Sequence, residues 1–164
     1  MVTFKGEQVE LKGHILEVGS DAPKVKLVAQ DLSVKEIGGA SGKFQVINVV
    51  PSLDTGVCAT QTRTFNQKAA SLDNTEVFVV SLDLPFAQKR FCTTEGIEKV
   101  QALSDFRKKS FGKKYGLILK DSPLKGLLTR AVIVINPAGK IIYEEVVSEI
   151  TTEPNYEKAL ESIK

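Results

Sequence analysis

The chain has two cysteines, Cys58 and Cys92, and the first lies where a buried strand is expected to give way to a helix. The apolar run from Phe44 to Val50 precedes it, and a helical pattern begins near Ala59. The first turn of a helix carries unpaired backbone N–H groups and a positive field. Such a field favours the thiolate, which is the nucleophilic form of cysteine. The sequence therefore predicts a reactive thiol at Cys58.

A cysteine nucleophile without a histidine beside it needs other groups to hold its thiolate. The single histidine, His14, lies far away in the N-terminal segment, where we expect it on the surface. The helix N-terminus offers N–H donors, and Thr55 offers a hydroxyl. Arg130 directly precedes an apolar run, so its side chain can lie at the end of the sheet; Arg63, one turn into the predicted helix, is the alternative cation. For either arginine, an ordinary surface position is the simpler interpretation.

The two thiols leave several kinds of site open. They are too far apart in the sequence for the Cys-X-X-Cys motif of a thioredoxin-type reductase. Structural zinc usually takes four cysteine or histidine ligands, and a cysteine–histidine catalytic pair needs a nearby histidine, so we expect neither. Free cysteine is often buried and protonated, and both residues can be inert in this way. Their neighbours favour reactive thiols, because Cys58 follows a loop with proline and glycine and Cys92 lies in a polar segment.

Length and composition fit one folded domain, expected over residues 1–164. Hydrophobic residues make up 42% of the chain and charged residues 26%, which is typical of a globular protein. The net charge of +2 gives no reason to expect nucleic acid or an anionic membrane as a partner. The N-terminal residues lack the pattern of a secretory signal, and no apolar run is long enough to span a bilayer. We therefore expect a cytoplasmic protein, in whose reducing surroundings a cysteine pair is more often catalytic, redox-sensing or metal-bound than static.

The elements that must position these residues follow from the apolar pattern. An N-terminal β-hairpin is predicted over residues 1–18, and a second hairpin over residues 131–147 turns at residues 136–140. Further strands are predicted at 24–29, 44–50, 76–82 and 102–104, and helices at 59–72, 85–99, 106–111 and from Pro154 onward. This order predicts an α/β protein with a thioredoxin-like fold, in which helices flank both faces of a central mixed β-sheet.

The run Pro51-Ser52-Leu53-Asp54-Thr55-Gly56-Val57-Cys58 has the spacing PxxxTxxC and resembles the signature of the peroxiredoxins. The string PSLDTGVC and the residues after it are similar to the bacterial thiol peroxidase branch of that family. Further similar segments lie at 81–88, 90–92, 95–97, 103–107, 126–131 and 153–156, so the resemblance spans essentially the whole chain. Gly56 departs from the pattern, because the branch commonly has proline there. This change is expected to loosen the active loop while leaving the chemical groups in place.

The resemblance implies an atypical two-cysteine peroxidase with one active unit per chain. Cys58 would be the peroxidatic cysteine and Cys92 the resolving cysteine, and the two would form an intramolecular disulfide. Pro51 would shield the thiolate from water, while Thr55 and Arg130 would hold the thiolate and the peroxide oxygens. The implied substrates are alkyl hydroperoxides and hydrogen peroxide, and thioredoxin would regenerate the enzyme. The family usually works as a homodimer, without metal, haem or flavin.

Two other functions stay open at this point. A thioredoxin-fold redox sensor would use the same thiols, and its disulfide would switch a partner-binding surface after a single oxidation event. A non-redox scaffold would carry two inert thiols. A peroxidase differs from both because it turns over when a reductant is supplied.

Overall fold

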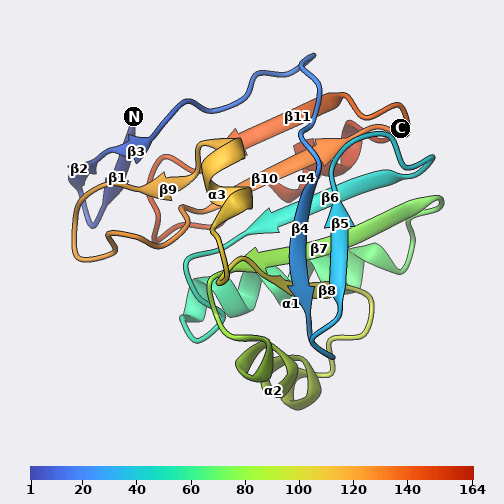
Figure 1. Cartoon of the computed structure of the whole chain (residues 1–164), viewed down its shortest axis with the longest axis horizontal. Helices are drawn as coiled ribbons and strands as arrows, with labels where there is room; N and C mark the ends of the chain where they lie inside the picture. The colour runs from blue at the N-terminus through green and yellow to red at the C-terminus, as the bar shows by residue number, and fades with distance from the viewer.

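The computed structural model describes all residues from Met1 to Lys164. Its centre is a seven-stranded sheet with the strand order β11–β10–β6–β7–β8–β4–β5 (Figure 1). These strands are β4 (Val25–Ala29), β5 (Val34–Ile37), β6 (Phe44–Val49), β7 (Thr75–Ser81), β8 (Gln101–Ser104), β10 (Ala131–Ile135) and β11 (Ile141–Val146). β6, β7 and β8 are parallel neighbours, while the other pairings are antiparallel. The predicted central mixed sheet and second hairpin are therefore confirmed.

The parallel strands at the centre are buried on both faces, which explains their nearly continuous apolar sequences. Alternate residues of a strand point to opposite faces of its sheet. In β7, Val77 and Val79 pack in one hydrophobic cluster, and Phe78 and Val80 pack in the other. Each face of the sheet therefore has its own core, and each core needs a cover.

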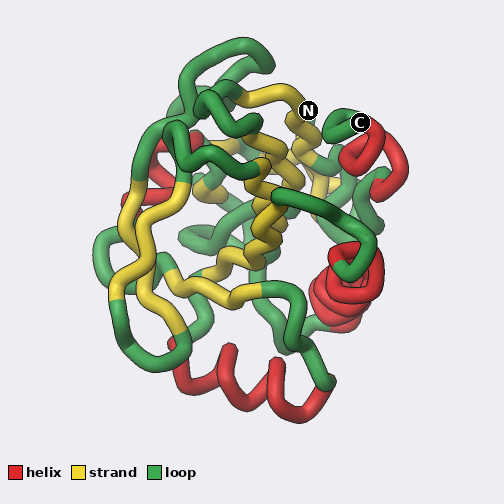
Figure 2. Tube along the Cα trace, turned by 90° about the vertical axis from the view of Figure 1, so that its right-hand side faces the viewer, coloured by secondary structure: helices red, strands yellow, loops and turns green.

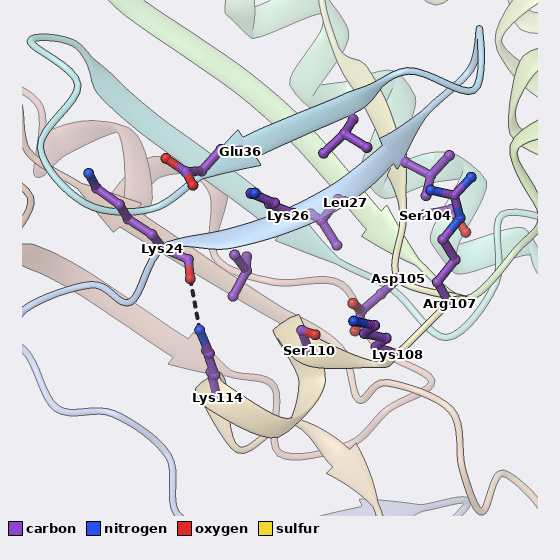
Figure 3. Close-up of a pocket in the computed structure, with 13 residues that line it drawn as sticks. Lys24, Lys26, Leu27, Glu36, Ser104, Asp105, Arg107, Lys108, Ser110 and Lys114 are labelled. Carbon is purple, nitrogen blue, oxygen red and sulfur yellow. Dashed lines mark hydrogen bonds between the residues drawn. The ribbon is translucent and has the colours of Figure 1, made fainter.

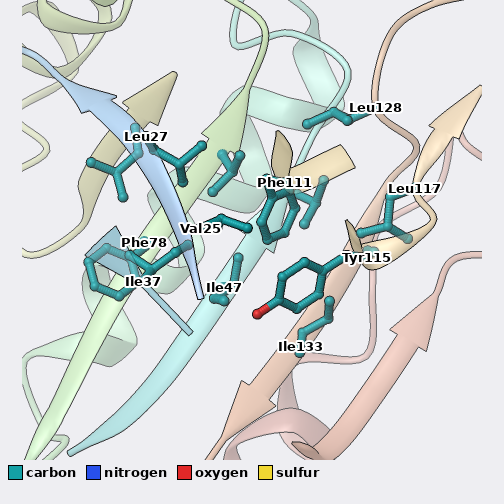
Figure 4. Packing of buried hydrophobic residues seen from close by; sticks show 14 of the residues in the cluster. Val25, Leu27, Ile37, Ile47, Phe78, Phe111, Tyr115, Leu117, Leu128 and Ile133 are labelled. Carbon is teal, nitrogen blue, oxygen red and sulfur yellow. The ribbon is translucent and has the colours of Figure 1, made fainter. Parts of the chain in front are cut away.

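Helices provide this cover on both faces, as predicted (Figures 1 and 2). They are α1 (Gly56–Ala69), α2 (Pro85–Glu95), α3 (Ser110–Tyr115) and α4 (Tyr156–Glu161). α1, α2 and α4 contribute to one cluster, which includes Phe65 and Ala159. α3 covers the other face, where the rings of Phe111 and Tyr115 stack with centroids 4.5 Å apart (Figure 4). The thioredoxin-like α/β arrangement expected from the sequence is the one observed.

Two small sheets lie beside the central one. They pair β1 (Val2–Phe4) with β2 (Glu7–Val9) and β3 (Leu11–Lys12) with β9 (Ile118–Leu119). The first pair is the predicted N-terminal hairpin, but it ends at Val9 instead of residue 18, because the chain then leaves to pair with β9. His14 lies in the connection that follows and is exposed.

The N-terminal hairpin is fastened to the segment after β11. The N–H of Ile150 donates to the carbonyl oxygen of Thr3 at 2.9 Å. The Glu149 carboxylate accepts from the backbone N–H groups of Thr151 at 2.9 Å and Gly6 at 2.8 Å. These hydrogen bonds lower the pKa of Glu149 to about 2, and the bond from the Thr151 N–H has the largest effect. The backbone around Ile150 is therefore held from both sides.

The third helix starts later than predicted. α3 begins at Ser110, and residues 106–108, predicted as helix, form a turn. The Asp105 carboxylate accepts from the N–H groups of Phe111 at 3.1 Å and Gly112 at 2.9 Å. Asp105 therefore satisfies N–H donors in the first turn of α3. These contacts place the start of the helix at Ser110, later than the predicted start at residue 106.

The last helix also starts slightly later than its proline suggests. α4 begins at Tyr156, because Asn155 is its N-cap and accepts from the N–H of Lys158 at 3.1 Å. Pro154 stands just before this cap, outside the helix that it was predicted to open. In length and apolar content, every helix of the structure falls short of what a membrane span requires.

Candidate active site

The loops after β6 and β7 share one edge of the sheet, because these strands are parallel and their carboxyl ends lie together. The first loop holds Pro51, which is buried, and Thr55, which is the N-cap of α1 with an extended backbone (φ −101°, ψ 149°). α1 begins at Gly56, before the predicted start near Ala59. Cys58 therefore lies inside the first turn of the helix, where backbone N–H groups are unpaired.

Gly56, where the family pattern commonly has proline, is the first residue of α1. A β-carbon at this position would meet no atom within 4 Å. Proline is favoured at the first position of a helix, because its φ is preset and its missing N–H is not needed there. Glycine adds conformational freedom instead. The first turn of α1 is therefore less restrained in this chain than it would be with proline.

The Cys58 side chain is fully buried, with 0% of its surface exposed. None of the four main surface cavities is lined by Cys58, Thr55 or Arg130. The cavity in Figure 3, of about 450 Å³, lies between β4 and α3, and its basic lining residues are Lys24, Lys26, Arg107, Lys108 and Lys114. The Cys58 side chain is therefore closed to solvent in this conformation.

The hydroxyl of Thr55 is bound within its own loop. It donates to the Ser52 carbonyl oxygen at 3.1 Å, and the Thr55 N–H donates to the same oxygen at 3.2 Å. No hydrogen bond joins this hydroxyl to Cys58 in this conformation. The structure thus places Thr55 at the start of the Cys58 helix, but the contact with the thiol that the resemblance implies is not made here.

Arg130 is buried, with 2% of its surface exposed, although its simplest expected place was the surface. Its Nε donates to the Ile150 carbonyl oxygen at 2.7 Å, and one terminal nitrogen donates to Gln61 Oε1 at 3.0 Å. Both acceptors are neutral, and Arg130 forms no ion pair. A buried charge without a counter-ion is costly. The guanidinium is therefore a cation to which an anion can bind with little competition.

Gln61 connects this arginine to the helix of Cys58, and it was not among the residues predicted for the site. Gln61 lies one turn after Cys58 and is fully buried. Its Nε2 donates to Asn48 Oδ1 at 3.3 Å, and Asn48 Nδ2 donates to the Phe78 carbonyl oxygen at 3.2 Å. This chain of amides orients Gln61 so that its Oε1 faces Arg130. The sequence signal that could have identified Gln61 is its place three residues after Cys58, on the same face of the helix.

Arg63, the alternative cation, lies elsewhere. Its NH1 is 3.3 Å from Glu95 Oε2, which joins α1 to the end of α2. A second contact joins α1 to the segment after α2, because Asn66 Oδ1 accepts from the N–H groups of Glu98 at 3.2 Å and Lys99 at 2.7 Å. Of the two arginines, Arg130 is the buried one that contacts the Cys58 helix through a polar network. Arg63 is a half-exposed link between the two helices that carry the cysteines.

Cys92 is nearly fully buried in α2, with 5% of its surface exposed. The helix ends soon after it, at Gly96 in the left-handed conformation (φ 67°). Burial raises the pKa of the Cys92 thiol to about 11, against a smaller opposing effect of a hydrogen bond from Gln30. Both cysteines are free thiols. They belong to one hydrophobic cluster on the same face of the sheet, but to different helices.

The sequence matches the Redoxin family over residues 17–160. It is 58% identical over 158 residues to a thiol peroxidase of Campylobacter jejuni, which covers 96% of this chain and 89% of that protein. This chain belongs to the thiol peroxidase branch of the redoxin family. A thiol peroxidase of Bacillus subtilis is 46% identical to this redoxin over 163 residues, 99% of this chain and 96% of that protein.

A solved structure supports the same family. The crystal structure of a peroxiredoxin-like protein from Aquifex aeolicus matches this redoxin with a TM-score of 0.96 and 47% identity, over 99% of this chain and 94% of that one. The similarity therefore extends through the loop that carries Cys58 and the helix that carries Cys92. The family resemblance read from the sequence is confirmed.

In this redoxin, Cys92 is expected to be slow to alkylate at neutral pH, because its thiol is buried and protonated. In a Cys58→Ser variant, Cys92 is the only thiol, and its alkylation by monobromobimane should rise with an apparent pKa of about 11. After unfolding in guanidinium, the same thiol should titrate near the ordinary value of about 8.5. A value near 8.5 in the folded variant would contradict the buried position.

The same shift has a consequence for stability. The pKa of Cys92 is raised in the folded protein, so the unfolded chain loses this proton first as the pH rises. The stabilisation is fully present below the unfolded pKa and is lost as the pH rises through the folded value of about 11. The free energy of unfolding of the reduced protein should therefore fall as the pH rises from the unfolded pKa to about 11. Cys92→Ala should reduce this dependence on pH.

Proposed function

We propose that this chain is a thiol-dependent peroxidase that reduces alkyl hydroperoxides and hydrogen peroxide to alcohols or water. The observation that carries the proposal is a free cysteine in the first turn of α1, the helix whose Gln61 accepts a hydrogen bond from Arg130, a buried cation without a counter-ion. Thiol peroxidases that are 46% and 58% identical over nearly the whole chain support it.

The first step oxidises Cys58. Its thiolate attacks the terminal oxygen of the hydroperoxide, so an S–O bond forms while the O–O bond breaks. The sulfur keeps the terminal OH of the peroxide and becomes a sulfenic acid, and the other oxygen leaves as an alkoxide or hydroxide that takes a proton from solvent to give an alcohol or water. Negative charge develops on the leaving oxygen, where the Arg130 guanidinium and the Thr55 hydroxyl can stabilise it. One such donor is typically worth about 3–4 kcal/mol. Pro51, buried at the start of the loop, keeps water from the thiolate.

The second step resolves the sulfenic acid. The Cys92 sulfur attacks the Cys58 sulfur, an S–S bond forms, and the hydroxyl leaves as water. The two thiols of thioredoxin then reduce this disulfide by exchange and become oxidised themselves. Both cysteines start as free thiols on the same side of the sheet, which supports this pairing. Neither step requires a metal, haem or flavin.

Formation of the Cys58–Cys92 disulfide is expected to change the backbone around both residues. A disulfide tolerates Cα separations only up to about 7 Å, and the two cysteines lie in separate helices. The start of α1 and the region of Cys92 should therefore unwind locally. Hydrogen exchange of reduced and oxidised protein should differ most at residues 55–62 and 86–98. Equal protection in both forms, with the bond confirmed by mass spectrometry, would show that no such movement occurs.

A coupled assay tests the function directly. The protein, thioredoxin, thioredoxin reductase and cumene hydroperoxide are combined, and NADPH consumption is followed over many equivalents of peroxide. We expect continuous consumption that depends on the protein. Consumption that stops after one equivalent would favour a redox sensor, and free thiols that survive one equivalent of peroxide would favour a scaffold with inert cysteines.

We also propose that the protein acts in the cytoplasm as a homodimer, as the resemblance implies. Two large apolar side chains at the start of α2 are exposed, Leu84 by 51% and Phe86 by 67%, and are available for a subunit contact. Sedimentation at micromolar concentration that gave only the mass of one chain would contradict the dimer.

A further inference from the structure

One carboxylate joins the loop that carries Cys58 to the segment that leads to Cys92. Asp83 follows β7 and stands just before Leu84, the N-cap of α2. Its Oδ1 accepts from the Ser52 hydroxyl at 2.7 Å, and its Oδ2 accepts from the Leu53 N–H at 2.8 Å. Ser52 and Leu53 belong to the loop between β6 and α1. The two segments are brought together because β6 and β7 are parallel neighbours.

The contact on the α1 side reaches the helix start in short steps. The carbonyl oxygen of Ser52 accepts from both the hydroxyl and the N–H of Thr55. The Ser52 hydroxyl accepts from the N–H of Asp54 at 3.2 Å while it donates to Asp83. Thr55 is the N-cap of α1, so the position of Ser52 determines where the first turn with Cys58 begins.

On the α2 side, hydrogen bonds connect Asp83 through Ser81 to Gln88 of the helix. The Ser81 hydroxyl donates to Asp83 Oδ2 at 2.7 Å and accepts from Gln88 Nε2 at 3.1 Å. Gln88 also donates to the Leu103 carbonyl oxygen at 2.9 Å and is fully buried. It lies one helical turn before Cys92. A single network therefore runs from the Cys58 loop through Asp83 to the face of α2 that carries Cys92.

The donors around Asp83 match the two acceptor oxygens of a carboxylate. Three donors, two hydroxyls and one N–H, converge on its two oxygens, and Asp83 forms no ion pair. Hydrogen bonds to a charged acceptor are roughly twice as strong as neutral ones. An asparagine of the same shape would present an NH₂ group to donors on one side, so at least one of the contacts would be lost.

We propose that Asp83 is a positioning residue of the peroxidase reaction. Its carboxylate holds Ser52 and Leu53, and through them Thr55, and so fixes where the first turn of α1, which carries Cys58, begins. This inference rests on the proposed function, and it adds a residue that touches neither cysteine. We expect Asp83 to promote the oxidation of Cys58, whereas the later attack by Cys92 requires the start of α1 to unwind, which these contacts oppose.

The test compares the two steps in Asp83→Asn. Stopped-flow measurements with cumene hydroperoxide give the rate of Cys58 oxidation, and quenched samples analysed by mass spectrometry give the rate of disulfide formation that follows. We expect the second-order rate constant of oxidation to fall by about ten- to a hundredfold, the range of one charge-assisted hydrogen bond. The rate of disulfide formation should not fall, since this step requires the start of α1 to unwind and the loss of the Asp83 contacts does not hinder that movement.

Two further variants complete the experiment. Ser52→Ala removes one donor from the Asp83 carboxylate and should slow oxidation in the same direction but less; it decides the matter if Asp83→Asn does not fold. Asp73→Asn is the charge-matched control, because Asp73 is exposed in the connection before β7. Its rates should equal those of the unchanged protein.

The outcomes separate the inference from the function on which it rests. A folded Asp83→Asn that oxidises as fast as the unchanged protein overturns the positioning role. So does an equal loss in both steps together with a lowered Tm, because that is the result of a merely structural residue. If the unchanged protein itself does not react with peroxide, the proposed function fails and the positioning role fails with it.

Discussion

Replacing Cys58 with serine is expected to reduce peroxide turnover to background, a loss on the order of a thousandfold or more, as for other enzymes deprived of their nucleophile. A serine hydroxyl is not appreciably ionised at neutral pH and cannot be oxidised to the equivalent of a sulfenic acid. The side chain is completely buried and nearly the same size, so the fold should persist. The coupled NADPH assay measures the loss, and circular dichroism confirms the fold.

Cys92→Ser is the matched control for that variant. Cys92 is also a buried free thiol, so both substitutions exchange sulfur for oxygen in a similar environment. Cys92→Ser should still consume one equivalent of peroxide, because Cys58 remains, but it should not turn over with thioredoxin. Near-normal peroxide consumption by Cys58→Ser would contradict the assignment of the nucleophile.

Replacing Arg130 with methionine should slow the reaction of Cys58 with peroxide by about two to three powers of ten, the typical effect of losing one donor to a developing oxyanion. Methionine keeps much of the apolar bulk but removes the charge and the donors. It also leaves Gln61 Oε1 and the Ile150 carbonyl oxygen without their partner. A buried acceptor left unsatisfied costs about 1–3 kcal/mol, so a lower Tm should accompany the kinetic loss.

Arg63→Met provides the comparison, since it removes the same group from the same region. Arg63 is half-exposed and pairs with Glu95, and exposed ion pairs contribute only about 0–1 kcal/mol. Its rate of oxidation by cumene hydroperoxide should therefore change by less than about fivefold. A greater loss in Arg63→Met than in Arg130→Met would show that the wrong arginine has been assigned.

The fold was largely predictable because its central strands have unambiguous sequences. β6, β7 and β10 are nearly continuous apolar runs, the pattern of strands that are buried on both faces. β5 and β9 were not predicted. β5 has three residues that are not buried, and β9 is only two residues long, so neither carries a periodicity strong enough to detect.

The candidate site was predictable only in part, and the reason is the range of its interactions. Cys58 and Thr55 are close in the sequence, so the helix start that they share could be inferred from local signals. Gln61, Asp83 and Arg130 find their partners across the fold, from Asn48, Ser52 and Ile150. A polar residue in a helix or loop is ordinarily solvated, and its sequence gives no sign that a distant donor or acceptor will bury it.

The bonds to Ile150 and the packing of α4 determine when during synthesis the site can form. Cys58, Asp83, Cys92 and Arg130 all leave the ribosome before Ile150 does. Yet the Arg130 side chain bonds to the Ile150 carbonyl oxygen, and Tyr156 packs edge-on against Phe65 of the Cys58 helix. A nascent chain that ends before these segments would carry both thiols without the supports of the finished site. Peroxide chemistry should therefore require a chain that extends at least through Tyr156.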